Sequence, residues 1–150
     1  HRRKGFMAVM QEEARVNDTE SLIFEALDLS IREGYHAMEQ ISKRFRPPFS
    51  VFVVNDDTAM GVIKYCNRRD FRIPEDVSLI GFSNIDLIDE LDLGLSSIHI
   101  PAMEMGRKAA ELLVTCAQRG DSTCRPEQVT LPVKLIDRRS TSDVLFESPS

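Results

Sequence analysis

The sequence lacks an excess of positive charge: its 150 residues carry a formal net charge of −5 at pH 7. A protein that grips DNA through its phosphates needs a basic face, so this balance argues against DNA binding by these residues themselves. No apolar run approaches the roughly 20 residues of a membrane-spanning helix, and the sequence has no repeat. With 42% hydrophobic and 29% charged residues, the composition is that of an ordinary globular protein of one domain.

Cysteines and the motifs of common enzyme classes are also scarce. Cys66, Cys116 and Cys124 are odd in number and have no C-x-x-C spacing, which favours reduced cytosolic thiols over a disulfide framework. The three histidines are not spaced as metal ligands. No G-x-S-x-G, P-loop or G-x-G-x-x-G motif is present. We therefore expect no metal, no cofactor and no catalytic activity.

The most informative stretch lies in the middle of the chain. Val51–Val54 is short and β-branched, as a fully buried parallel strand should be. Asn55–Asp57 can cap the following helix and place negative charge at its N-terminus. The helix is predicted over 58–69, and Val77–Ile80 is a second buried strand that Gly81 closes. This order predicts a strand–helix–strand unit.

Hydrophobic spacing predicts the remaining elements. Helices are expected over 1–13, 31–45, 86–90 and 102–118, and extended segments over 21–26, 96–100 and 129–136. The three strands at 21–26, 51–54 and 77–80, separated by two helices, predict an α/β fold with an open parallel sheet and helices on both faces. The polar residues 138–150 are expected to form a mobile tail.

Ligands of an open parallel sheet bind beyond the carboxyl ends of the strands. In this chain those ends present Asp28–Leu29, Asn55–Asp56 and Ser83–Asn84. Asn55 can cap a helix or contact a ligand, because its amide both donates and accepts hydrogen bonds. Asp56 and Asp57 could suggest a metal site, but adjacent carboxylates at a helix start are better explained by the helix dipole.

Several motifs, in order, resemble one family of bacterial regulators. They are R-x-x-G-F at Arg2–Phe6, V-N-D-D-x-A-M-G at Val54–Gly61, I-P-E-D-V-S-L-I-G-F at Ile73–Phe82 and P-V-K-L-I-D-R-R-S-T at Pro132–Thr141. Together they are similar to the lactose-repressor/galactose-repressor (LacI/GalR) family of transcription regulators. The N-D-x-x-A-x-G piece by itself also occurs in periplasmic sugar-binding proteins.

The resemblance implies a type I periplasmic-binding-protein-like domain, in which two lobes hold an effector between them. Residues 1–137 would be the C-terminal part of this domain, mainly the second lobe, with 101–125 returning to the first lobe and 138–150 as a tail. The chain starts without Met, and we expect it to be part of a longer protein with an upstream helix-turn-helix. The family also implies a cytoplasmic homodimer that binds operator DNA and a sugar or sugar derivative, without a membrane.

In the family, the positions that match Arg2, Leu29, Asn55 and Ser83 face the effector. Relatives often carry an aromatic ring where this chain has Leu29, so stacking on the ligand is not expected here, and Leu29 could equally be an ordinary core residue. Relatives commonly carry an acid where this chain has Ser83. Its loss makes the cleft more positive by one charge, which favours an anionic carbohydrate-like effector, unless Asn84 or Asp86 takes over the role.

Two rival functions remain open at this point. A periplasmic sugar-binding protein of the same fold is the first, although the I-P-E-D-V-S-L-I-G-F and R-R-S-T segments are more typical of repressors. An enzyme on an α/β sheet is the second, but the sequence offers no nucleophile or acid–base pair that would support it.

Overall fold

The computed structural model describes residues 2–13, 17–86, 88, 92–119 and 128–142 of the chain. One sheet contains β1 (Phe49–Phe52), β2 (Val77–Ser83), β3 (Ser96–His99) and β4 (Lys134–Ile136), in that order. The first three strands are parallel, and β4 is antiparallel to β3. The expected open α/β sheet is confirmed, with the refinement that it is mixed, because β4 runs back along β3.

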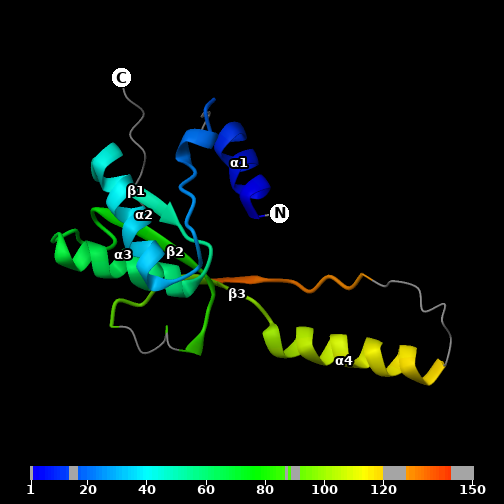
Figure 1. Ribbon diagram of the computed structural model, residues 1–150. Helices are drawn as coiled ribbons and strands as arrows, with labels where there is room; N and C mark the ends of the chain where they lie inside the picture. Colours follow the sequence, from blue (N-terminus) through cyan, green and yellow to red (C-terminus); the bar gives the residue numbers. More distant parts are fainter. Residues whose placement is uncertain (1, 14–16, 87, 89–91, 120–127, 143–150) are drawn as a thin grey trace.

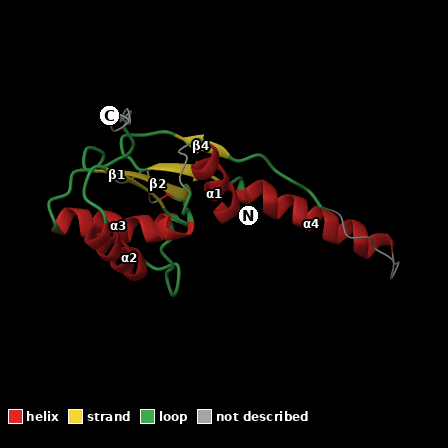
Figure 2. Ribbon diagram, turned by 90° about the horizontal axis from the view of Figure 1, so that it is seen from above, coloured by secondary structure: helices red, strands yellow, loops and turns green. Residues whose placement is uncertain are grey.

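Helices lie on both faces of this sheet, as the sequence predicts. They are α1 (Arg2–Glu12), the 3-10 helix η1 (Glu20–Leu22), α2 (Ile31–Arg44), α3 (Asp56–Arg68) and α4 (Ala102–Arg119). Figure 1 shows α2 and α3 side by side on one face of the sheet, with α1 across from them. In both Figure 1 and Figure 2, α4 projects away from the sheet, and none of the residues 102–118 is buried.

The central strand–helix–strand unit is confirmed, with shifted boundaries. α3 begins at Asp56 because Asn55 caps it: the Asn55 side-chain oxygen accepts from the Thr58 N–H at 3.0 Å. β2 does not close at Gly81 but continues to Ser83. Gly81 lies inside this strand, and a Cβ atom there would lie 2.3 Å from Oδ1 of Asp56.

The strand expected over 21–26 is wrong. Hydrogen bonds within this segment form a turn instead: the Ser21 N–H donates to Oδ1 of Asp18 at 3.2 Å, and Ile23 N–H donates to the Glu20 carbonyl at 3.0 Å. Asp and Ser side chains that bond to the nearby backbone compete with sheet pairing. β1 accordingly pairs only with β2 among the described strands.

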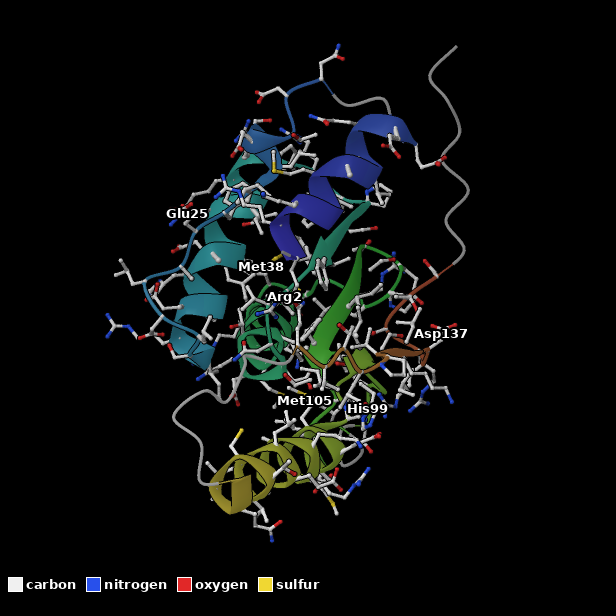
Figure 3. The ribbon with its side chains drawn as sticks, turned by 90° about the vertical axis from the view of Figure 1, so that its right-hand side faces the viewer. Arg2, Glu25, Met38, His99, Met105 and Asp137 are labelled. Carbon is white, nitrogen blue, oxygen red and sulfur yellow. The ribbon has the colours of Figure 1, made fainter. Side chains whose placement is uncertain are left out.

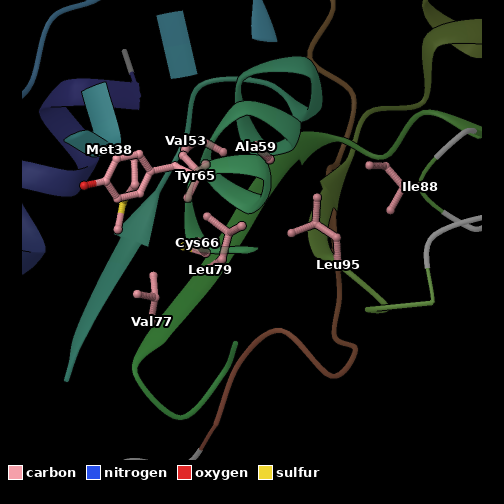
Figure 4. Packing of buried hydrophobic residues seen from close by; sticks show 10 residues of the cluster. Met38, Val53, Ala59, Tyr65, Cys66, Val77, Leu79, Ile88 and Leu95 are labelled. Atoms are coloured by element: carbon pink, nitrogen blue, oxygen red, sulfur yellow. The ribbon is translucent and has the colours of Figure 1, made fainter. Parts of the chain in front are cut away.

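The core lies between the sheet and the α2–α3 pair. Figure 4 shows Met38 of α2 and Tyr65 and Cys66 of α3 beside Val77 and Leu79 of β2, all of them buried. The two helices cross closely at two glycines. A Cβ atom on Gly34 would lie 2.1 Å from the Thr58 carbonyl oxygen, and one on Gly61 would lie 2.0 Å from that of Ile31.

Three further expectations need correction. The strand at 51–54 is not fully buried, because the helices α2 and α3 cover only one of its faces, and Phe52 and Val54 remain 38% and 40% exposed. Arg138–Ser142 is not a mobile tail: the buried Ser140 hydroxyl donates to the Leu79 carbonyl at 2.6 Å and accepts from the Ser96 N–H at 2.8 Å. Cys116 is disulfide-bonded, whereas Cys66 is a free, buried thiol.

One other predicted segment is only partly confirmed, and another is only partly described. The strand expected over 129–136 forms only at Lys134–Ile136. The short helix expected over 86–90 contains residues outside the described part of the chain, and Asp86 and Ile88 have 3-10 geometry. In the described part of the chain, no helix is long and apolar enough to cross a membrane.

Candidate functional site

The predicted site residues come from four separate segments of the chain and gather at one edge of the sheet. Asn55 follows β1 and caps α3, while Ser83 is the last residue of β2. Arg2 is the first residue of α1, and Leu29 lies just before α2. β1 and β2 are parallel, so their carboxyl ends meet at this edge, where the sequence predicts a ligand site.

Arg2 reaches the strand ends by two contacts. Its guanidinium donates a hydrogen bond to the carbonyl of Val54, the residue before Asn55. The same group lies 4.2 Å from the centroid of the Phe82 ring, directly before Ser83. Figure 3 shows Arg2 at the N-terminal end of α1. The stacked guanidinium is exposed, so it can bind ligand oxygens through its remaining N–H groups.

Both the oxygen and the nitrogen of the Asn55 side-chain amide form hydrogen bonds within the protein. Its oxygen caps α3, and its nitrogen donates to the Leu29 carbonyl at 3.1 Å. The capping role that the sequence suggested is therefore confirmed. One amide hydrogen and one oxygen lone pair are left over, which suffices for a single ligand hydroxyl. The bond to Leu29 also links the loop before α2 to the end of β1.

Leu29 is 56% exposed, so the alternative that it is an ordinary core residue is wrong. Phe52, Val54 and Ile85 are also exposed apolar residues close in sequence to the strand ends. Next to Leu29, the pKa of Asp28 is lowered because it accepts hydrogen bonds from Ser30, chiefly through the Ser30 side chain. The edge thus offers apolar area beside charged and amide groups.

Ser83 sits in an unusual backbone conformation. Ser83 and Asn84 have φ angles of 114° and 54°, in the region that residues other than glycine seldom adopt. The Ser83 carbonyl accepts from the Ile100 N–H at 3.4 Å, and the Asn84 N–H donates to Oγ of Ser97 at 3.2 Å. Among the described residues, the buried side-chain oxygen of Asn84 has no hydrogen-bond partner.

The sequence places Asp56 at this edge, but sequence reasoning assigned it only to the helix dipole and did not predict its burial. The helix dipole explains Asp57, which is exposed, but the Asp56 side chain is only 1% exposed. Its Oδ1 accepts from the Ser97 hydroxyl at 2.8 Å, and its Oδ2 accepts from the Ile85 N–H at 3.0 Å. The signal that could have identified it is Gly81, whose missing side chain leaves room for this carboxylate.

Metal-binding chemistry has no support in the described residues, which contain no group of three or more His, Cys, Asp or Glu side chains able to hold an ion. The chemistry that the edge offers is reversible binding. A guanidinium, an amide and a hydroxyl can hold oxygen atoms of a ligand, and the exposed apolar side chains can cover its carbon atoms.

Comparisons with known proteins identify the family to which this fold belongs. Residues 1–141 match the periplasmic binding protein-like domain family. The HTH-type transcriptional repressor PurR of Escherichia coli O1:K1 is 34% identical over 142 residues, which are 95% of this chain and 40% of the repressor. The chain therefore spans less than half the length of this relative.

Two solved structures extend the comparison. The LacI family transcriptional regulator of Enterococcus faecalis V583, solved with bound ribose, is 32% identical with a TM-score of 0.78, over 95% of this chain and 49% of that one. The transcription regulator CcpA of Lactococcus lactis is 25% identical with a TM-score of 0.81, over 92% and 49% respectively. The chain belongs to the periplasmic binding protein-like domain family, as a relative of the LacI-family transcriptional regulators.

Proposed function

We propose that the chain is the ligand-sensing part of a LacI/GalR-type transcription regulator. It binds a small carbohydrate-like effector through Arg2, Leu29, Asn55 and Ser83, and this binding modulates DNA affinity of an N-terminal helix-turn-helix outside this sequence. The observation that supports the proposal most is the clustering of these four positions, from separate elements, at the carboxyl edge of β1 and β2. The regulator acts in the cytoplasm as a homodimer.

The chemistry of this edge fits a sugar. Sugars present hydroxyl groups around a ring whose faces are largely carbon and hydrogen, so a binding site needs both polar groups and apolar area. Arg2 and Asn55 supply the polar groups, and Leu29 supplies apolar area without an aromatic face. Relatives of this chain have been solved with ribose, sucrose and lactose bound, which supports the same ligand class here.

In this proposal a first lobe covers the edge from the other side. The exposed α4 supports this arrangement, because Met103 and Leu113 are 92% and 72% exposed on a helix whose sequence pattern is amphipathic. We propose that α4 packs on that first lobe and that 101–125 return to it. The effector would then lie between lobes, and its binding would change their relative orientation.

A periplasmic sugar-binding protein is the alternative function. The similarity to PurR, which extends over 95% of this chain, favours the regulator. The relatives are transcription regulators and not enzymes, which argues against the enzyme alternative as well. The upstream coding sequence separates the two binding functions, since a regulator requires a helix-turn-helix there and a periplasmic protein requires a secretion signal.

The test is a thermal-shift screen of sugars, sugar phosphates and nucleobases on the full-length protein. A ligand that binds only the native state raises the apparent melting temperature. We expect a carbohydrate or sugar phosphate to raise it, and the same compound to change operator affinity in an anisotropy titration. Stabilisation by nucleobases alone would contradict the proposed ligand class, and a ligand without effect on DNA affinity would contradict the regulatory role.

A further inference from the structure

The buried carboxylate of Asp56 connects three segments that meet behind the candidate site. It accepts from the Ser97 hydroxyl of β3 at 2.8 Å and from the Ile85 N–H at 3.0 Å. Ser97 is itself fully buried, and its Oγ accepts from the Asn84 N–H at 3.2 Å. We call Asp56, Ser97 and the two backbone amides of Asn84 and Ile85 the Asp56 joint.

A buried carboxylate is costly unless hydrogen bonds or a cation compensate for its lost hydration. Among the described residues, no lysine, arginine or histidine forms an ion pair with Asp56. The Ser97 hydroxyl and the Ile85 amide therefore carry this compensation. Gly81 makes it possible, because any Cβ atom there would lie 2.3 Å from Oδ1 of Asp56.

The joint holds the turn that contains Ser83. Ser83 and Asn84 both have positive φ angles, and such conformations persist only where the surrounding structure imposes them. The Asp56 joint binds the backbone N–H groups of the two residues that follow Ser83. Without it, the strained turn would lose the hydrogen bonds that define its shape, and the Ser83 side chain would lose its fixed position.

The same joint ties this turn to the segment that leads toward α4. Ser97 lies within β3, and Ser83 pairs with His99 in the parallel register of β2 and β3. The Ile100 N–H also donates to the Ser83 carbonyl at 3.4 Å. Pro101 follows, and α4 begins at Ala102. A displacement of the turn therefore moves β3 and the base of α4, which Figure 1 shows projecting from this end of the sheet.

We propose that Asp56, acting through Ser97, is a positioning residue that fixes Ser83 for the effector and couples the effector site to β3 and α4. The coupling part of this inference rests on the proposed function. The positioning part rests on the hydrogen bonds alone, and the two parts can be tested separately.

Two variants remove the joint in different ways. Asp56→Asn keeps the size of the side chain, but its N–H₂ group either faces the Ser97 hydroxyl, whose hydrogen then loses its acceptor, or faces the Ile85 N–H, which places two donors against each other. Ser97→Ala removes the hydroxyl and adds no charge. Ser140→Ala is the matched control, because Ser140 is also a buried serine that links β2 and β3 through Leu79 and Ser96, away from the turn.

Hydrogen exchange in the full-length regulator, resolved by NMR, is the first measurement. We expect Asp56→Asn and Ser97→Ala to speed exchange at the Asn84 and Ile85 amides at least tenfold, with the amides of α2 unchanged. Ser140→Ala should leave both turn amides as in the wild type. Unchanged protection of the turn in Ser97→Ala would overturn the proposal, and this variant decides the outcome if Asp56→Asn does not fold.

Calorimetric titration with ribose is the second measurement, with operator affinity recorded with and without ribose. We expect the two joint variants to weaken ribose binding at least fivefold and to reduce its effect on operator affinity, while Ser140→Ala retains both. Equal losses in Ser140→Ala would show a merely structural effect and overturn the proposal. If wild-type protein does not bind ribose, the coupling part of the inference, for which ribose is the probe, is overturned, and the exchange data still decide the positioning role.

Discussion

At the scale of residues, the candidate site assigns more than one role to the same side chain. Asn55 caps α3 with its oxygen and holds Leu29 with its nitrogen. Ser83 ends β2, begins a strained turn and occupies the position where the resembled family commonly carries an acid. Substitutions at these positions therefore need controls that separate effects on stability from effects on ligand binding.

Asn55 allows such a separation. Asn55→Ala removes the cap, and we expect it to lower the free energy of unfolding by about 1 kcal/mol, the usual cost of losing a capping side chain. Asn55→Asp keeps a good cap, so it should retain most of the stability. Its carboxylate has no N–H to donate. Urea unfolding and effector titration of both variants check this expectation.

Effector binding should respond differently from stability. We expect Asn55→Asp to weaken the effector about tenfold, because a neutral or anionic ligand loses a donor and meets a carboxylate. Binding that follows stability instead, with Asn55→Ala weaker than Asn55→Asp, would show that Asn55 acts only as a helix cap.

Ser83 tests the charge of the ligand. Ser83→Asp restores a carboxylate, which accepts hydrogen bonds but repels anions. We expect it to weaken an anionic effector in calorimetry of the full-length regulator, by a smaller factor at high salt, because salt screens the repulsion. Ser83→Asn, which adds size without charge, is the control. If the best ligand is neutral and Ser83→Asp binds it more tightly, the charge argument is wrong.

At the scale of elements, the sequence predicted what periodicity and capping determine. The unit from β1 through α3 to β2 was predictable because a β-branched run, a capping residue and a helical repeat agree there. The expected strand over 21–26 was wrong because side-chain bonds from Asp18 and Ser21 form a local turn. Periodicity carries no information about such bonds.

Long-range contacts account for most of the other differences. The chain after Asp137 looked like a polar tail, yet Ser140 is fully buried because both its hydroxyl and its backbone bond to β2 and β3. The predicted location of the site rests on strand order, which carries no information about the burial of Asp56. A carboxylate beside a helix start is ordinarily solvated, and the contacts of Asp56 with Ser97, 41 residues away, and with the Ile85 N–H distinguish it.

The space around two glycines, Gly61 at the crossing of α2 and α3 and Gly106 in α4, predicts opposite effects for their alanine substitutions. Gly61→Ala would place a Cβ atom 2.0 Å from the Ile31 carbonyl oxygen, so the helices must separate. We expect it to lower the free energy of unfolding by about 1–3 kcal/mol, as overpacking does. Gly106→Ala in α4 meets nothing within 4 Å and should stabilise the protein by about 0.5–1 kcal/mol through helix propensity.

Denaturant unfolding of the two glycine variants beside the wild type measures both changes. A Gly61→Ala protein as stable as the wild type would mean that the helices can separate at no cost, against the close crossing described above.

At the scale of the whole molecule, the chain exposes surfaces that, in the function proposed above, other parts of a regulator cover. α4 is unpacked among the described residues, and a groove between α2 and α3 is lined by Arg32, Lys64, Arg68 and three uncharged or weakly basic neighbours. This groove is basic, but the chain as a whole is acidic. We expect the 150-residue chain to show no salt-resistant, sequence-specific DNA binding in an anisotropy titration, in contrast to the full-length regulator.

Self-association is the remaining expectation for the isolated chain. The resembled family forms its dimer partly through elements that match α2, α3 and the loop after Gly81. In addition, Met103, Leu113 and Val114 leave apolar area exposed on α4, and such surfaces tend to associate with another chain.

Three variants test these two surfaces. Leu113→Glu places a charge on the α4 surface, and Ile31→Glu places one at the α2–α3 groove. Gln118→Glu is the control, because it adds the same charge to α4 without replacing an apolar side chain. We expect sedimentation to show dimers or larger species for the wild type and Gln118→Glu, with weaker association in Leu113→Glu and Ile31→Glu. The variant with the larger loss identifies the dominant surface, and a wild-type chain that remains monomeric at high concentration would contradict both routes.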